Sequence, residues 1–182
     1  MEKTALRIRK YGDLTLRKKA GLVKKITPDH RDILSAMARL MYAGEGIGLA
    51  AAQVGLDQAM IVVDIGKGLY KVVNPKIVKA QGTQVNLEGC LSVPGICIKV
   101  KRANKIKVTG LDENGEPLNL EAEGLLACVF QHEIDHLKGR LIVDYASFPE
   151  KIKIARTLKE LKKKAEDENL SEPTKKSCEL QL

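Results

Sequence analysis

The chain has 182 residues, of which 44% are hydrophobic and 30% charged, and its formal net charge is +8. This length suits one domain with a sizeable core, and no stretch approaches the roughly 20 apolar residues that a membrane helix needs. The first residues lack the apolar segment of a secretory signal, and four cysteines are too few for a disulfide framework. We therefore expect a cytoplasmic protein that does not bind a membrane.

The first predicted element is a helix that begins at Thr27. Thr27 is a suitable N-cap, and Pro28 is favoured in the first turn. Apolar residues then recur at helical spacing up to Gly44, at Ile33, Met37, Leu40 and Met41. The next segment, Gly46–Ala51, formally matches a dinucleotide fingerprint, but it follows a helix instead of a strand, and no acidic residue lies about twenty positions on. We expect no nucleotide cofactor.

Short strand patterns dominate the middle of the chain. They lie at residues 60–65, 70–74, 96–101, 105–108 and 118–120. The last two flank Asn114-Gly115, a dipeptide typical of a tight hairpin turn. This succession of short strands favours antiparallel sheet.

Two further helices are predicted near the C-terminus. The segment from Gly124 to Gln131 lacks proline and is apolar on nearly all sides, which indicates a buried helix that ends near Gly139. The spacing of Ser147 and Glu150 fits a capping box for a second helix. That helix carries apolar residues on one face, at Ile154, Leu158, Leu161 and Ala165.

Together these elements predict an α+β fold. Antiparallel β-sheets should pack around the central buried helix, and the amphipathic helix should follow it. We expect one domain at residues 1–165. Residues 166–182 are polar and are expected to form a flexible tail.

The central helix carries His132-Glu133-Ile134-Asp135-His136, which reads H-E-x-x-H. Residues four apart on a helix share a face, so two imidazoles can bind one metal ion while the glutamate acts as a base for water. The chain has only three histidines, and two of them lie in this motif. This pattern favours a metal-dependent hydrolase over a pair of structural histidines.

The third metal ligand is less certain from spacing alone. Catalytic sites of this kind use three protein ligands and leave one position for water. His30 lies in a separate polar helix start, and Ile142 stands where an extended motif would have a third histidine. Glu150 and Glu160 are carboxylates in a basic, surface-like segment.

Four cysteines remain as candidates. Cys128 lies about 12 Å along the helix from His136, too far for a straight helix to close both on one ion, so a core position is expected. Cys97 lies in a strand pattern and should be structural, and Cys178 lies in the polar tail. Cys90 lies in a Gly-rich turn where the backbone can approach a ligand closely, although a structural role stays open.

Three segments resemble the motifs of the peptide deformylase family. They are Gly46–Gln53 (G-x-G-x-A-A-x-Q), Glu88–Ser92 (E-G-C-L-S) and His132–His136 (H-E-x-D-H), in the family's order. The segment Tyr11–Arg17 is also similar to the family's opening, and the resemblance covers about residues 5 to 165. Ala52 and Leu14 stand where the family often has proline.

The resemblance implies a hydrolase that removes the N-terminal formyl group from formyl-methionine of newly made polypeptides and releases formate. It implies Cys90, His132 and His136 as metal ligands and Glu133 as the catalytic base. Gln53 and the backbone N–H of Leu91 would then stabilise the oxyanion.

The resemblance also implies a substrate pocket. The backbone at Ile47 and Gly48 would pair with the extended peptide, and the methionine side chain would lie near Leu125, Cys128 and Val129. Glu88 is expected at the same pocket, where it would pair with Arg102 and brace the turn that carries Cys90.

The resemblance implies one divalent metal ion, natively Fe²⁺, with Zn²⁺, Ni²⁺ or Co²⁺ as alternatives. Residues 151–164 contain seven Lys or Arg and one acidic residue, so the last helix either presents a solvated face or contacts a polyanion. The resemblance implies that this polyanion would be ribosomal RNA. The expected partners are the N-formylmethionyl nascent peptide and, if this helix docks on rRNA, the ribosome.

Two other functions are compatible with the sequence. One is a metallopeptidase whose third ligand is a carboxylate such as Glu150 or Glu160. The other is a non-enzymatic, basic RNA- or ribosome-binding module with a structural metal.

Overall fold

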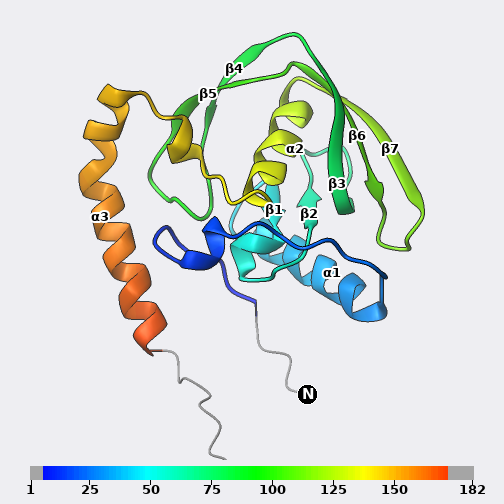
Figure 1. The fold of residues 1–182 in the computed structure, drawn as a ribbon, viewed down its shortest axis with the longest axis horizontal. Coiled ribbons are helices and arrows are strands. Elements are labelled where there is room, and N and C mark those ends of the chain that lie inside the picture. The colour runs from blue at the N-terminus through cyan, green and yellow to red at the C-terminus, as the bar shows by residue number, and fades with distance from the viewer. Residues whose placement is uncertain (1–5, 172–182) are drawn as a thin grey trace, which may run out of the picture.

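The structure, a computed structural model, describes residues 6–171. Seven strands form two antiparallel sheets (Figure 1), as the sequence predicts. The larger sheet has the order β1-β2-β3-β6-β7 and the smaller one pairs β4 with β5. The strands are β1 (Gly48–Ala50), β2 (Met60–Val63), β3 (Tyr70–Gln81), β4 (Gln84–Glu88), β5 (Ile98–Arg102), β6 (Lys105–Leu111) and β7 (Pro117–Glu123).

Three α-helices surround and fill this framework. They are α1 (Pro28–Ala43), α2 (Leu125–His136) and α3 (Phe148–Ser171). Three short 3₁₀-helices connect the elements, at η1 (Leu14–Arg17), η2 (Ala51–Val54) and η3 (Ile142–Tyr145). None of the helices within residues 6–171 is long and apolar enough to cross a bilayer.

The burial pattern of β2 explains how the larger sheet is sandwiched between helices. All four of its residues, Met60–Val63, are fully buried, so the strand has no solvent face. Ile61 and Val63 belong to the core around α2, while Met60 and Val62 belong to the core beneath α1. An uninterrupted apolar strand is the expected sequence for a position covered on both faces.

The predicted helix boundaries agree closely with the structure. Thr27 is the N-cap of α1, and its backbone N–H donates to His30 Nδ1 at 3.1 Å. The Glu150 half of the predicted capping box before α3 is present, because the backbone N–H of Ser147 donates to Glu150 Oε2 at 2.8 Å. His30 therefore serves helix capping.

The C-terminal helix differs from the prediction at its end. It continues through Glu166 to Ser171, past the expected boundary at residue 165, and residues 172–182 lie outside the described part of the chain. Its apolar face packs as predicted, because Ile154, Leu158 and Leu161 contact a core that also contains Leu16 and Val143. In Figure 1, α3 lies along one side of the molecule.

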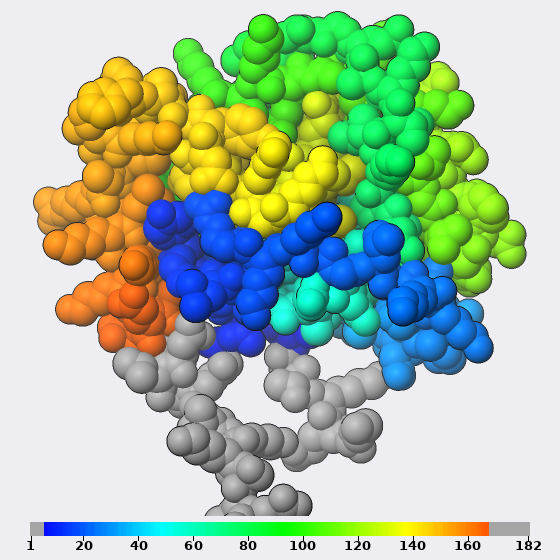
Figure 2. Space-filling model, viewed as in Figure 1, coloured from blue at the N-terminus to red at the C-terminus, as the bar shows by residue number. Residues whose placement is uncertain are grey.

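The N-terminal segment joins this side to the centre. Arg9 N–H donates to Gln53 O at 2.7 Å, and Tyr11 N–H donates to Ser92 O at 2.8 Å. Gly12 has φ +111°, and a Cβ there would lie 2.8 Å from Lys162 Cα of α3, so only glycine fits. Figure 2 shows this segment (blue) lying against α3 (orange).

Candidate metal centre

Helix α2 presents two imidazoles to the space between the two sheets. Because His132 and His136 are one turn apart, their rings lie on one face of the helix, with centroids 4.8 Å apart. The two Nε2 atoms are 3.2 Å apart. Helix α2 is itself fixed by its core residues, of which Phe130 is fully buried.

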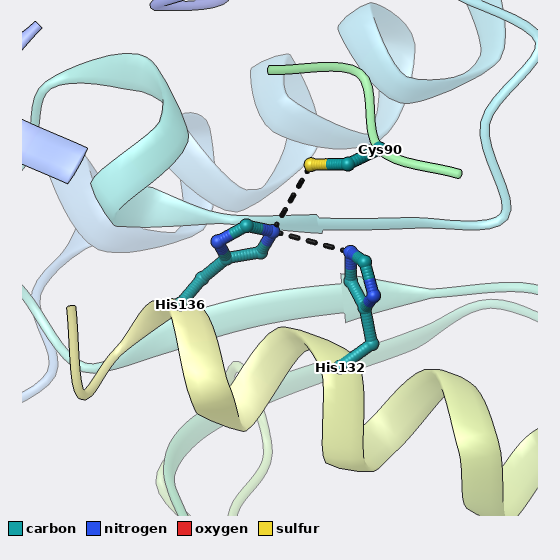
Figure 3. Close-up of side chains that lie close together, drawn as sticks. All are labelled: Cys90, His132 and His136. Carbon is teal, nitrogen blue, oxygen red and sulfur yellow. Dashed lines mark hydrogen bonds between the residues drawn. The ribbon is translucent and has the colours of Figure 1, made fainter. Parts of the chain in front are cut away.

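The third candidate ligand comes from a different part of the fold. Cys90 follows strand β4 in a turn closed by the Val93 N–H to Cys90 O hydrogen bond of 2.9 Å. Its Sγ lies 3.3 Å from His136 Nε2. Figure 3 shows the sulfur approaching from the side opposite α2, so that the three side chains point toward one another.

This arrangement fits a metal ion. The three ligand atoms all lie within 4.8 Å of one another, and no other cluster of three or more such groups occurs among the described residues. With metal–nitrogen bonds of ~2.1 Å and a metal–sulfur bond of ~2.3 Å, tetrahedral ligands lie about 3.4–3.6 Å apart. The two separations that involve His136 Nε2, 3.2 and 3.3 Å, are close to that requirement, and the third lies within 4.8 Å.

The rival ligands are occupied elsewhere or lie apart. Glu150 accepts hydrogen bonds from Ser147, and Glu160 pairs with Arg156 on the exposed side of α3. Cys128 Sγ lies 3.1 Å from Glu88 Oε1 and is not part of the three-residue cluster. Cys97 is also outside the three-residue cluster, as predicted, but it is exposed and precedes β5 by one residue instead of lying in the strand. Cys178 lies outside the described residues.

Behind His132 lies a buried ionic network. Glu88 Oε2 accepts from His132 Nδ1 at 2.9 Å, which directs Nε2 toward the cluster. The predicted Glu88–Arg102 pair is present, with two parallel hydrogen bonds of 2.8 and 2.9 Å. Burial opposes ionisation of Glu88, but hydrogen bonds from Arg102 and His132 outweigh it and lower its pKa to about 2.

Arg102 also connects this network to residues that the sequence did not single out. Its Nη1 pairs with Asp135, and the Tyr145 hydroxyl donates to the same carboxylate at 2.6 Å. The Arg102 guanidinium lies over the Tyr145 ring, 4.9 Å from its centroid. The position of Asp135 inside H-E-x-x-H was the only sequence feature that could have pointed to it. No sequence feature pointed to Tyr145.

Glu133 occupies a confined position beside the cluster. It is 3% exposed, and its Oε2 atom has no hydrogen-bond partner among the described residues. Burial, reinforced by the negative charge of Glu88, raises the pKa of Glu133 to about 7, although His132 and Arg102 oppose the rise. A Cβ at Gly48 would collide with Glu133 Oε1, so the close approach of β1 depends on glycine.

Gln53 is held with its amide directed at the same space. It is 1% exposed, and its Oε1 accepts from the Ala50 N–H at 2.8 Å. This fixes Nε2, which lies 3.2 Å from Ser92 Oγ and 3.5 Å from Cys90 Sγ. The arrangement gives a preorientated hydrogen-bond donor next to the candidate ligand.

A cavity of about 490 Å³ opens onto these groups. Every predicted substrate-pocket residue lines it, namely Ile47, Gly48, Glu88, Leu125, Cys128 and Val129. Gln53, Cys90, Leu91, His132 and Glu133 line it as well. His136 is not among the lining residues and is 1% exposed. The Leu91 carbonyl accepts from Lys10 Nζ at 2.9 Å, a support that the sequence did not predict.

The chain is similar to known proteins over most of its length. A sequence model of the family described as polypeptide deformylase matches residues 5–151. The peptide deformylase of Syntrophomonas wolfei is 53% identical over 131 residues, which cover 72% of this chain and 86% of that protein. The peptide deformylase of Carboxydothermus hydrogenoformans is 50% identical over 135 residues, covering 74% and 89%.

Solved structures show the same fold. The crystal structure of peptide deformylase from Thermotoga maritima matches with a TM-score of 0.76 and 44% identity, covering 78% of this chain and 97% of that one. A peptide deformylase from Synechococcus elongatus in complex with actinonin matches with a TM-score of 0.80 and 37% identity, covering 86% and 90%.

Proposed function

This chain belongs to the polypeptide deformylase family, and from that premise we propose that Cys90, His132 and His136 hold its metal ion and that Glu133 is its catalytic base. The enzyme is a metal-dependent hydrolase that removes the N-terminal formyl group from formyl-methionine of new polypeptides. The observation that carries the residue assignment is the convergence of three ligand atoms beside a buried glutamate.

The proposed mechanism begins with proton removal from water. A divalent ion held by Cys90, His132 and His136 would supply Lewis acidity, which would make water more acidic and polarise the formyl group. Glu133 takes the proton from the attacking water and later delivers it to the departing amine nitrogen. The confined Oε2 atom, without another partner among residues 6–171, leaves the carboxylate available for this transfer.

The negative charge that develops on the formyl oxygen must be stabilised by hydrogen-bond donors. Gln53 Nε2 is proposed as one donor and the backbone N–H of Leu91 as a second. The Oε1 contact with Ala50 keeps Gln53 from rotating, so its donor is aimed before the reaction begins. The products are formate and a free N-terminal amine.

The shape and lining of the cavity support the proposed binding of a peptide substrate. The backbone at Ile47 and Gly48 would pair with the extended peptide, and the first side chain would lie against Leu125, Cys128 and Val129. Leu125 and Val129 are four residues apart on α2 and so form one continuous wall.

The proposed native ion is Fe²⁺, with Zn²⁺, Ni²⁺ or Co²⁺ able to replace it. Ligand type alone does not select among these ions, because the affinity order favours zinc over iron and cells select by availability. An Fe²⁺ site with a thiolate ligand should lose activity in air as Cys90 oxidises. Metal analysis of protein purified without oxygen tests the identity of the ion.

We place the enzyme in the cytoplasm, where α3 would dock on the ribosome. All seven Lys and Arg side chains of residues 151–164 are exposed, while the apolar face packs on the domain. Because that face supports the core, charge reversal at Lys159 and Lys163 is a cleaner test than deletion of the helix. We expect this variant to lose co-sedimentation with ribosomes at low salt, while Lys79→Glu on β3 keeps it. Unchanged binding would refute the docking role.

The central test is formate release from formyl-Met-Ala-Ser. We expect turnover that stops when a chelator removes the metal and resumes when Fe²⁺ is restored. Cys90→Ala should lose both metal and activity, because two imidazoles alone hold the ion weakly, whereas Cys97→Ala is the matched control and should retain both. A Cys90→Ala protein that binds metal at full occupancy would show that another residue is the third ligand.

A further inference from the structure

Strand β4 turns polar side chains inward and apolar ones outward, the reverse of an ordinary half-buried strand. Val85 and Leu87 are 62% and 67% exposed. Gln84, Asn86 and Glu88 alternate with them and are more buried. The inward row lies next to α2, since Gln84 contacts the Gly124 carbonyl and Glu88 contacts His132.

Two of these three inward residues have clear structural partners. Gln84 Nε2 donates to Ala103 O at 3.1 Å and to Gly124 O at 2.8 Å. Glu88 binds Arg102 and His132. Asn86 lies between them and lines the cavity, but its Nδ2 atom is shielded from solvent and has no hydrogen-bond partner within residues 6–171.

The polar group beside Asn86 is the Cys128 thiol, which is a poor substitute for a hydrogen-bond partner. Burial and the hydrogen bond to Glu88 raise the pKa of Cys128 to about 12, so the thiol stays neutral. Its hydrogen is directed to Glu88 Oε1 at 3.1 Å, and its sulfur is a weak acceptor. Buried amides are normally hydrogen-bonded, so an amide left without a partner at a cavity wall indicates a ligand that supplies one.

Leu125 and Val129, in contrast to Asn86, give the cavity an apolar wall. A first side chain that enters the cavity therefore meets hydrocarbon from α2 and an amide from β4. Among the described residues, the Asn86 Nδ2 atom has only the weak contact with Cys128, so rotation about the Cβ–Cγ bond can turn the NH₂ group toward the cavity with little loss for that atom.

We infer that this cavity also accepts formyl peptides whose first residue is methionine sulfoxide, with the Asn86 amide donating a hydrogen bond to the sulfinyl oxygen. The inference rests on the proposed function and adds a second class of substrate to it. Methionine sulfoxide has nearly the length of methionine but carries a strong acceptor. Water cleaves the formamide C–N bond, its oxygen goes to formate and its protons to formate and the amine, and the sulfoxide is unchanged.

The test compares kcat/KM for three peptides that differ only in the first residue. They are formyl-Met-Ala-Ser, formyl-Met(O)-Ala-Ser and formyl-Nle-Ala-Ser, in which norleucine replaces the sulfur by a methylene group. The variant is Asn86→Leu, which has similar size and no donor. The control is Asn119→Leu on β7, an exposed asparagine that does not line the cavity.

We expect the ratio of sulfoxide to norleucine kcat/KM to fall fivefold or more in Asn86→Leu and to stay unchanged in Asn119→Leu. A smaller fall, or an equal fall in both variants, overturns the inference. If the wild-type enzyme does not hydrolyse formyl-Met-Ala-Ser itself, the proposed function fails instead, so the two failures are distinguishable.

A second measurement needs no substitution. In zinc-loaded wild-type protein, the side-chain NH₂ resonance of Asn86 should shift when the product Met(O)-Ala-Ser is added and should shift less with Nle-Ala-Ser. Equal shifts, or none, would overturn the inference even if Asn86→Leu did not fold.

Discussion

At the scale of single residues, Glu133 combines a confined position with one carboxylate oxygen, Oε2, that has no hydrogen-bond partner among the described residues. Its position between α2 and Gly48 fixes the carboxylate, while Oε2 has no partner within the described chain. Glu133→Gln keeps the shape and removes the base. We expect kcat to fall about 10²–10⁴-fold, the usual contribution of general acid–base catalysis. Metal content should be unchanged, which atomic emission measures alongside formate release. An active Glu133→Gln enzyme would assign the proton transfer to another group.

Replacement of Arg102 should lower both the stability of the fold and its affinity for metal. It is 6% exposed and neutralises two buried carboxylates, Glu88 and Asp135. Arg102→Met leaves both without their cation, which should lower the free energy of unfolding by about 3–5 kcal/mol. Since Glu88 orients His132, metal affinity should also fall about 10–100-fold.

The control for Arg102→Met is Lys101→Met on the exposed face of the same strand. Urea unfolding and competition with a metal-sensitive dye measure the two effects. Equal stability and equal metal affinity in both variants would show that the network does not support the ion.

At the scale of elements, η3 is tied to η1 by one ion pair, Arg17 Nη1 to Asp144 Oδ2 at 2.6 Å. Partial burial raises the pKa of Asp144, but hydrogen bonds from Arg17 and the Leu141 N–H outweigh it, so the pKa lies below its ordinary value. As pH falls, the unfolded chain takes up this proton first. The stabilisation is therefore complete above the unfolded pKa of about 3.9 and disappears as pH falls through the lower folded pKa.

This gives a pH-dependent prediction for Asp144→Asn. Because both side chains are more than a third exposed, the loss should be only about 0.2–1 kcal/mol. It should stay constant from pH 7 to about pH 5 and shrink below about pH 4. Arg17→Met should lower the pH dependence in the same way, and urea unfolding at several pH values measures it. A difference that grows on acidification would contradict the assignment.

Helix α3 is a packed element as well as a charged one. Leu158 contacts the core that contains Val93 and Leu141, whereas the adjacent Lys159 is exposed. Leu158→Ala should lower the free energy of unfolding by about 1–2 kcal/mol, less than a fully buried leucine would lose. Lys159→Ala should change it by less than about 0.5 kcal/mol. Equal effects would mean that α3 does not pack stably on the domain.

At the scale of the whole molecule, the elements with local signals were the ones that the sequence predicted. The cap at Thr27, the turn at Asn114-Gly115 and the spacing of His132 and His136 depend on residues a few positions apart. Strand β4 was missed, because its polar residues face inward and alternation of apolar residues would place the wrong face against the core. Strand β1 was missed because three residues give no period.

The parts of the candidate site that could not be predicted depend on distant contacts. Gln53 meets Cys90 across 37 positions, and Arg102 meets Asp135 across 33. Family motifs named Gln53 and Cys90, but nothing in the sequence indicated that Tyr145 would lie beneath Arg102. Such contacts are set by how the two sheets enclose α2, which local patterns do not encode.

The two imidazoles belong to a helix packed on the larger sheet, while the cysteine follows a strand of the smaller one. An ion bound by all three therefore acts as a cross-link between the halves of the fold. At a free metal concentration a thousand times the dissociation constant, that cross-link would add about 4 kcal/mol to stability. The melting temperature therefore reports the fraction of protein that has metal bound, and exposure to air should lower the melting temperature together with the turnover.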